Sequence, residues 1–110
     1  MRKRSKLRGL GLHPLSHINK AADMVEEARR AREDMSSHME EGNCVLAFHS
    51  LRKADSFLGK ARSHTYSVLS DPNSLPGERH EAEKLDREIR SAKNSLDISS
   101  RRFEYKCIPE

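Results

Sequence analysis

Five cations fall within seven residues near the start of the sequence, an arrangement that can neutralise neighbouring phosphates. Binding of this kind releases counterions and weakens steeply as salt is added. No aromatic residue interrupts the run, so we expect contacts to phosphates without readout of the base sequence. A short nuclear address, docking on an acidic protein surface and a solubilising tail remain alternatives. The residues predicted to bind nucleic acid are Arg2, Lys3, Arg4, Lys6 and Arg8.

Four leucines accompany these cations, and a segment that only bound phosphates would not need them. Their presence suggests that the segment lies against an apolar surface, either on its own body or on a partner. The alternative function is therefore a protein–protein adaptor or regulator that docks this leucine-containing segment and a helical face on a partner protein. The residues predicted to dock are Leu7, Leu10, Leu12 and Leu15.

The histidines and the nucleophilic side chains do not form a pattern typical of a metal centre or an enzyme. His13 and His17 have a spacing that would place both imidazoles on one helix face, but Pro14 between them disfavours a helix there. No glycine-flanked nucleophile and no glycine-rich phosphate loop occur. We therefore expect no enzyme, no catalytic residue, no metal and no cofactor.

The charge is divided unevenly along the chain. Six of the 21 basic residues lie within residues 1–22, which contain no acid, and the remaining 15 face all 17 acids. This division predicts a basic tail on a slightly acidic body. No run of residues approaches the apolar length of a membrane span. We expect no membrane contact, and a cytoplasmic or nucleic-acid-associated location, the nucleus and a virion included.

The elements that must position these residues are helices. Gly9, Gly11 and Pro14 break any regular helix near the start, which predicts an extended basic arm over residues 1–15. Beyond it, apolar residues recur in alternating steps of three and four, as on the buried face of a helix. The connections are short, so neighbouring helices should be antiparallel. We predict an all-α fold, an elongated antiparallel three-helix bundle over residues 16–110, with helices at about 16–41, 43–70 and 76–106.

This topology brings the start of the second helix and the end of the third to the same end of the bundle. Cys44 and Cys107 should then be neighbours. In a reducing compartment we expect free thiols, although a disulfide between them remains an alternative. The regular spacing on the third helix also suits coiled-coil packing between two copies. The residues expected to mediate self-association into a homo-oligomer are Leu85, Ile89, Leu96 and Phe103.

Taken as a whole, the sequence predicts a non-enzymatic accessory or structural protein. Its body would hold it in a larger protein assembly while its basic arm contacts nucleic acid. A small virion, nucleoid or ribonucleoprotein component fits this description.

Overall fold

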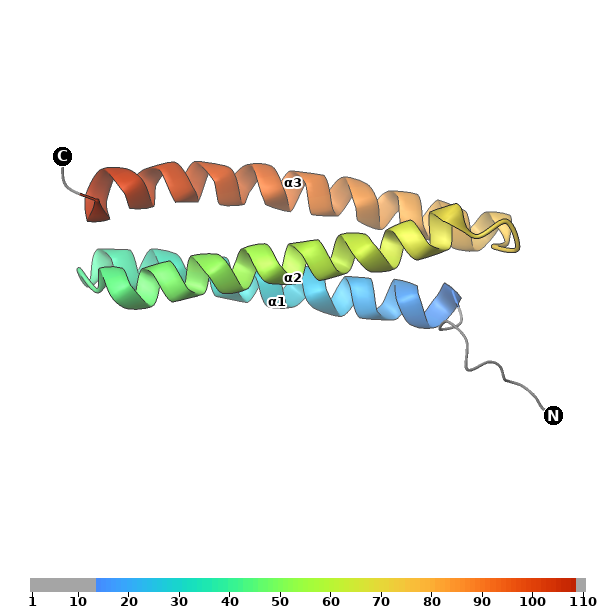
Figure 1. Cartoon of the computed structure of the whole chain (residues 1–110), viewed down its shortest axis with the longest axis horizontal. Coiled ribbons are helices and arrows are strands. Elements are labelled where there is room, and N and C mark those ends of the chain that lie inside the picture. The colour runs from blue at the N-terminus through green and yellow to red at the C-terminus, as the bar shows by residue number, and fades with distance from the viewer. Residues whose placement is uncertain (1–13, 109–110) are drawn as a thin grey trace.

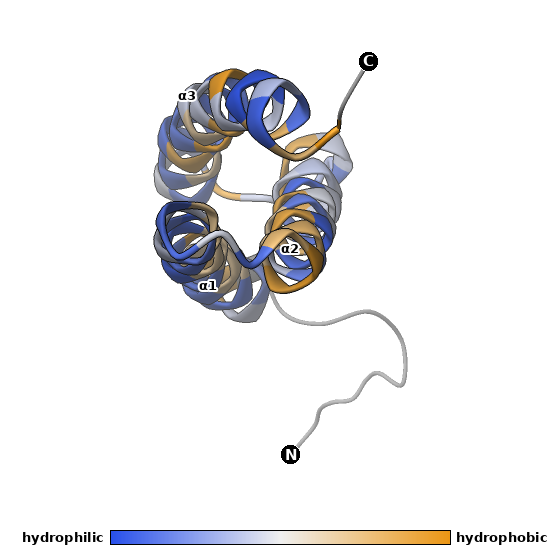
Figure 2. Ribbon diagram, turned by 90° about the vertical axis from the view of Figure 1, so that its left-hand side faces the viewer, coloured by the Kyte–Doolittle hydropathy of each residue, from blue (hydrophilic) through white to orange (hydrophobic). Residues whose placement is uncertain are grey.

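The fold is an elongated bundle of three α-helices, seen in a computed structural model that describes residues 14–108. The helices are α1 (Pro14–Glu40), α2 (Cys44–Ser70) and α3 (Pro76–Cys107). They lie side by side with antiparallel neighbours (Figure 1), and the molecule measures 59 × 22 × 19 Å. Viewed along its length, the bundle encloses one common core (Figure 2). The predicted all-α three-helix bundle is confirmed.

Helix α1 begins two residues earlier than predicted. It includes Pro14 and Leu15, which the sequence analysis assigned to the arm. The first N–H groups of a helix have no intrahelical partner, so a proline costs little in the first turn and its fixed φ favours the helix. The arm predicted over residues 1–15 therefore overlaps α1 at Pro14 and Leu15, and His13 lies outside the described residues.

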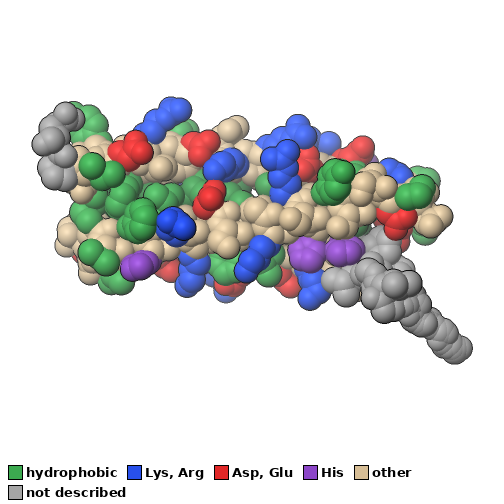
Figure 3. Space-filling view, in the orientation of Figure 1, with side chains coloured by type: hydrophobic (Ala, Val, Ile, Leu, Met, Phe, Trp, Pro, Cys, Tyr) green, Lys and Arg blue, Asp and Glu red, His purple; other side chains and the backbone are tan. Residues whose placement is uncertain are grey.

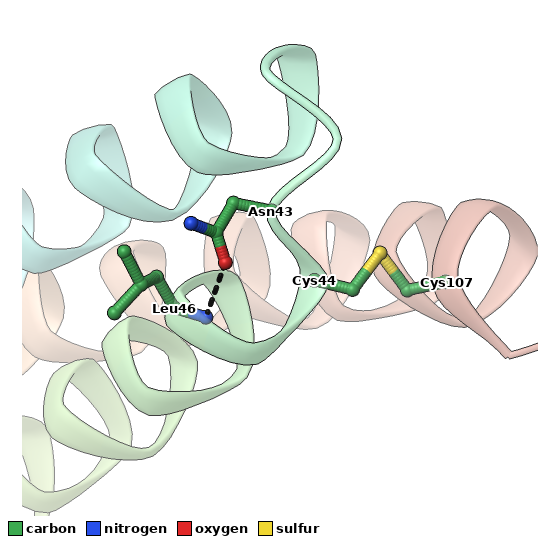
Figure 4. Close-up of a disulfide and its surroundings, with 4 residues drawn as sticks. All are labelled: Asn43, Cys44, Leu46 and Cys107. Atoms are coloured by element: carbon green, nitrogen blue, oxygen red, sulfur yellow. Dashed lines mark hydrogen bonds between the residues drawn. A yellow bond between two sulfur atoms is a disulfide. The ribbon is translucent and has the colours of Figure 1, made fainter.

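A tight turn joins α1 to α2. Gly42 has a φ of 77°, in the left-handed region where glycine is favoured. Asn43 then caps α2, because its side-chain oxygen accepts a hydrogen bond from the N–H of Leu46 at 3.2 Å (Figure 4). The turn leaves α1 and α2 as a closely packed antiparallel hairpin, and their contact is the most extensive in the bundle.

The second connection is held by side chains that bind the end of α2. Ser74 is buried, and its hydroxyl donates to the carbonyl oxygen of Val68 at 2.7 Å. The guanidinium of Arg79, in the first turns of α3, donates to the carbonyl oxygens of Leu69 at 2.9 Å and Asp71 at 2.6 Å. These bonds satisfy carbonyl groups that a helix end leaves without partners.

The core is built from small and aliphatic residues on one stripe of each helix. In α3 the buried residues recur in steps of three and four, as the sequence pattern predicts, and Ala92 on the same stripe is partly exposed. In α1 the stripe runs through Ala28, Ala31 and Met35, and Arg32 lies beside it. In α2, Thr65 is buried, whereas Val45 in the first turn is 68 % exposed.

The four residues predicted to mediate self-association lie in this core. Their side chains are at most 8 % exposed, because α3 turns its regular stripe toward α1 and α2 of the same chain. They are therefore not available to a second copy in this fold, and the prediction that they form such a surface is corrected. The residues are Leu85, Ile89, Leu96 and Phe103.

A disulfide joins Cys44 at the start of α2 to Cys107 at the end of α3 (Figure 4). The expected proximity is confirmed, with the two Cα atoms 5.6 Å apart. The sequence analysis favoured free thiols, and the structure instead shows the bond. It fixes α3 to the α1–α2 hairpin at the end opposite the Ser74 and Arg79 contacts. Within residues 14–108, no helix is long and apolar enough to cross a membrane.

Candidate nucleic-acid interface

The residues predicted to bind or dock lie almost entirely outside the described part of the chain. This holds for all five cations, Arg2, Lys3, Arg4, Lys6 and Arg8, and for Leu7, Leu10 and Leu12. Only Leu15 is described, in the first turn of α1 with its side chain 54 % exposed. A candidate interface on the bundle must therefore be identified from charges that the structure places.

The arginines in the middle of α1 are neutralised by acids on the same helix. Arg29 forms ion pairs with Glu26 and Glu33, and Arg30 contacts Glu26 at 3.4 Å and Glu27 at 3.3 Å. The Arg29 side chain lowers the pKa of Glu26, mainly through its hydrogen bonds to that carboxylate. This face is a solvated network of i,i+3 and i,i+4 pairs, and it presents little net positive charge to a partner.

Helix α2 has a different charge balance. It contains four basic residues and one acid, Asp55, whereas α3 has eight basic residues and seven acids. All four α2 cations are exposed, and within residues 14–108 none of them forms an ion pair with an acid. We call this set the α2 basic face, and it consists of Arg52, Lys53, Lys60 and Arg62.

The single acid of α2 is engaged elsewhere. The Asp55 carboxylate accepts a hydrogen bond from the ammonium group of Lys93 on α3 at 2.8 Å, and Lys93 also lies 3.5 Å from Asp97. The hydrogen bond to Asp55 is the main reason that the pKa of Lys93 is raised. Asp55 is thus neutralised across the α2–α3 contact, which leaves the α2 basic face without a local counter-charge.

Local contacts position two of these cations. The Arg52 guanidinium carbon lies 5.7 Å from the centre of the Phe48 ring, and the Lys60 nitrogen lies 5.9 Å from the centre of the Phe57 ring. Such cation–π contacts restrain long side chains without neutralising them. The buried residues of α2 point toward the core, away from these cations. Figure 3 shows Lys and Arg side chains that stand out from the visible surface of the bundle.

A groove between α2 and α3 extends this positive surface. It encloses about 410 Å³, and its floor is formed by the buried side chains of Leu58 and Ile89. Arg62, Arg90 and Lys93 line its rim. Asp86 lies 2.9 Å from Arg90, and Asp55 forms an ion pair with Lys93. The positive charges of these two rim residues are therefore partly balanced.

The arrangement suits electrostatic binding of a polyanion. From Arg52 to Arg62 the helix rises about 15 Å, roughly the axial rise of four base pairs of a nucleic-acid duplex. A shallow depression on α2 is lined by Arg52, Lys53 and Lys60 together with His49 and Ser56, whose polar groups can bond phosphate oxygens, and by Asp55, whose charge Lys93 offsets. Among the described residues there is no group of three or more histidine, cysteine, aspartate or glutamate side chains that could hold a metal ion.

The sequence analysis missed the α2 basic face. It divided the charge between a tail and a body, and in the body as a whole the acids of α1 mask the excess on α2. A count by helix shows four basic residues against one acid between Cys44 and Ser70. The sequence alone does not show that Lys93 of α3 forms an ion pair with Asp55, because the two residues are 38 positions apart.

Comparison with protein-family models, with curated proteins and with solved structures found no match for this chain.

Proposed function

We propose that this protein is a non-enzymatic accessory protein that binds nucleic acid through its phosphates. The α2 basic face is the contact surface on the bundle, and the basic run Arg2 to Arg8 provides a second one. The proposal rests on one observation above all. Four exposed cations on α2 have no ion-pair partner within residues 14–108, and the only acid of the helix is bound to Lys93.

The expected binding is electrostatic and does not depend on sequence. Lysine and arginine side chains contact phosphates wherever the backbone passes, and their affinity comes largely from counterion release. Phosphate contacts carry no sequence information by themselves. The four cations are spread along and around the exposed side of α2, so they would contact phosphates at several points of a backbone. Binding that does not depend on sequence suits a component of a virion, nucleoid or ribonucleoprotein that is part of a larger protein assembly.

The test compares two variants that lose the same amount of charge. Lys53→Gln with Lys60→Gln removes two unpaired cations of the α2 basic face, whereas Arg29→Gln with Arg30→Gln removes two ion-paired cations of α1. Fluorescence anisotropy measures binding to duplex DNA, single-stranded DNA and RNA at about 50 and 200 mM salt. We expect the α2 variant to bind several-fold more weakly and the α1 variant to bind nearly as well as the unmodified chain. Equal losses in both would leave only a net-charge effect and contradict the assignment to α2.

The contribution of the N-terminal cations is measured separately. A chain lacking residues 1–12 retains every residue that the structure describes, so its helical content should be unchanged. We expect its affinity to fall further than that of either double variant, because it loses five cations at once. Unchanged affinity would exclude the predicted role of Arg2, Lys3, Arg4, Lys6 and Arg8.

A second candidate function is that of an adaptor for another protein. The observation that supports it is the apolar surface at the disulfide end of the bundle, where Val45 is 68 %, Tyr105 92 % and Ile108 57 % exposed. Figure 3 shows hydrophobic side chains gathered at this end. Exposed apolar groups that lie close together are typical of protein contacts.

The two candidates make opposite predictions for the N-terminal residues. In an adaptor, replacing Leu10, Leu12 and Leu15 with serine should abolish capture of the partner, and reversing the charges of Arg2, Lys3 and Arg4 should matter less. For phosphate binding the ranking is reversed. Binding to immobilised nucleic acid and co-purification from cell extract, measured on the same two variants, distinguish them.

A further inference from the structure

Two histidines that are far apart in the sequence meet at one end of the bundle. His17 lies near the start of α1 and His64 near the end of α2, and their Nδ1 atoms are 2.8 Å apart. The ring centres are 5.0 Å apart and the rings are tilted by 43°. Both side chains are partly buried. Adjacent histidine side chains are visible on this part of the bundle in Figure 3.

The surroundings of His17 favour the neutral form of its imidazole. Partial burial lowers the pKa of His17, and the neighbouring His64 and Lys20 lower it further. A hydrogen bond between two Nδ1 atoms requires that one carries a hydrogen and the other presents a lone pair. When the donor ring instead carries its hydrogen on Nε2, both Nδ1 lone pairs are free to bind the same cation.

The spacing of the two nitrogens indicates which cation fits. Two imidazole nitrogens at about 2.0 Å from an ion lie about 2.8 Å apart at the right angle of a square-planar site, and about 3.3 Å apart at the tetrahedral angle. The observed separation of 2.8 Å, which is that of the hydrogen bond between the two unbound rings, is close to the first value. Square-planar nitrogen coordination is preferred by Cu²⁺ and Ni²⁺, and Cu²⁺ binds nitrogen ligands most tightly of the divalent ions in its row.

We propose that His17 and His64 form a two-imidazole binding site for Cu²⁺, with Nδ1 of each ring as a ligand. Water would occupy the remaining coordination positions, since the rings lie at the surface of the α1–α2 hairpin. A small rotation of each ring turns its lone pair from its neighbour toward the ion. The sequence pattern did not show this site, because the two residues are 47 positions apart and come together only when the hairpin closes. The inference is independent of the proposed nucleic-acid binding.

The bound ion should also stabilise the fold. It links the first turns of α1 to the last turns of α2, so it binds the folded chain and has no equivalent site in the unfolded chain. At a large excess of free Cu²⁺ over its dissociation constant, we expect the melting temperature to rise by about 5 °C. Both cysteines are in a disulfide, so no free thiol within the chain competes for or reduces the ion.

The experiment is a calorimetric titration of the full chain with Cu²⁺, Ni²⁺ and Zn²⁺ chlorides at pH 7.5, followed by electron paramagnetic resonance of the Cu²⁺ form. We expect one site that prefers Cu²⁺, with hyperfine coupling to two imidazole nitrogens. His17→Asn and His64→Asn should each lower the affinity at least tenfold, while His80→Asn, at an exposed histidine of α3, should leave it unchanged. Equal effects of all three variants, or tighter binding of Zn²⁺ than of Cu²⁺, would overturn the proposal.

A measurement on the unmodified chain covers the case in which a variant does not fold. Substoichiometric Cu²⁺ broadens the nuclear magnetic resonance signals of the rings that bind it. The signals of His17 and His64 should disappear first, ahead of those of His49 and His80. Broadening that begins at His49 or His80, or equally at all rings, would contradict the site.

Discussion

Arg79 illustrates how one side chain can fix the path of the chain between two helices. Its guanidinium donates to the carbonyl oxygen of Leu69 in the last turn of α2 and to that of Asp71 just after the helix, while its backbone belongs to α3. Hydrogen bonds to a charged donor are worth more than neutral ones. The orientation of α3 relative to α2 therefore depends on this residue at one end of the bundle and on the disulfide at the other.

Replacing Arg79 with alanine should lower the free energy of unfolding by about 1–2 kcal/mol, because two carbonyl groups lose their charged partner and only partly regain water. Urea denaturation followed by circular dichroism measures the change. Arg87→Ala is the matched control on the exposed face of α3 and should alter the stability by less than about 0.5 kcal/mol. Equal losses in the two variants would mean that the Arg79 contacts contribute nothing specific.

The His17–His64 pair should make stability depend on pH. The pKa of His17 is lower in the folded chain than its ordinary value of 6.5, so below that pH the unfolded chain binds the proton first. Protonation then favours unfolding, and the stability contributed above pH 6.5 is lost as the pH falls toward the folded-state pKa. Melting temperatures measured from pH 7.5 to pH 5 should decrease, and His17→Asn should reduce that decrease. A profile that His17→Asn does not alter would contradict this interpretation.

At the scale of elements, the disulfide contributes more to holding α3 in place than to holding the hairpin of α1 and α2 together. The hairpin has a connection of three residues and the most extensive helix–helix contact, whereas α3 packs less extensively on each of its neighbours. Cys44 and Cys107 are 63 residues apart, and closing a loop of that length in the unfolded chain corresponds to about 4 kcal/mol in the chain-entropy model.

Reduction should therefore destabilise the fold substantially. We expect Cys44→Ser with Cys107→Ser, or treatment with dithiothreitol, to lower the free energy of unfolding by about 2–4 kcal/mol. Mobility on non-reducing gels and thiol counting test whether the bond forms in the purified chain. Two free thiols in the native protein, with no change in stability on reduction, would contradict the role assigned to the bond.

The helices were predictable because their apolar spacing is regular, and the errors occur where it is not. On α3 the buried stripe follows the sequence pattern throughout. On α1, Arg32 stands four residues after Ala28, where the regular spacing would place an apolar residue, and the stripe instead steps from Ala28 to Ala31 and then to Met35. Burial there follows the size and polarity of the local residue. Val45 follows Cys44 directly, and because Cys44 turns toward α3, its neighbour is carried about 100° around the helix and out of the contact.

The candidate sites were harder to predict for a different reason. The α2 basic face depends on Lys93 of α3 neutralising Asp55, and the histidine pair depends on the closure of the hairpin. Both are contacts between residues dozens of positions apart, which local spacing does not encode. The N-terminal cations were recognisable from their density alone, but they lie outside the described residues and remain a prediction.

At the scale of the whole molecule, the described charges are segregated by helix. Helix α1 carries an excess of acids and pairs its central arginines internally, whereas α2 carries an excess of unpaired cations. A polyanion should therefore approach along α2, and the elongated shape of the bundle would allow α1 or the apolar disulfide end to contact other components of an assembly.

The most direct test of the proposed function is the salt dependence of duplex binding. The logarithm of the binding constant falls with the logarithm of salt concentration by about 0.9 for each phosphate neutralised. Replacing Arg52, Lys53, Lys60 and Arg62 with glutamine leaves the buried stripe of α2 intact, and it should make this slope shallower by up to about 3.6 relative to the unmodified chain. The same slope in both proteins, with helical content unchanged, would show that α2 does not contact the phosphates and would contradict the assignment.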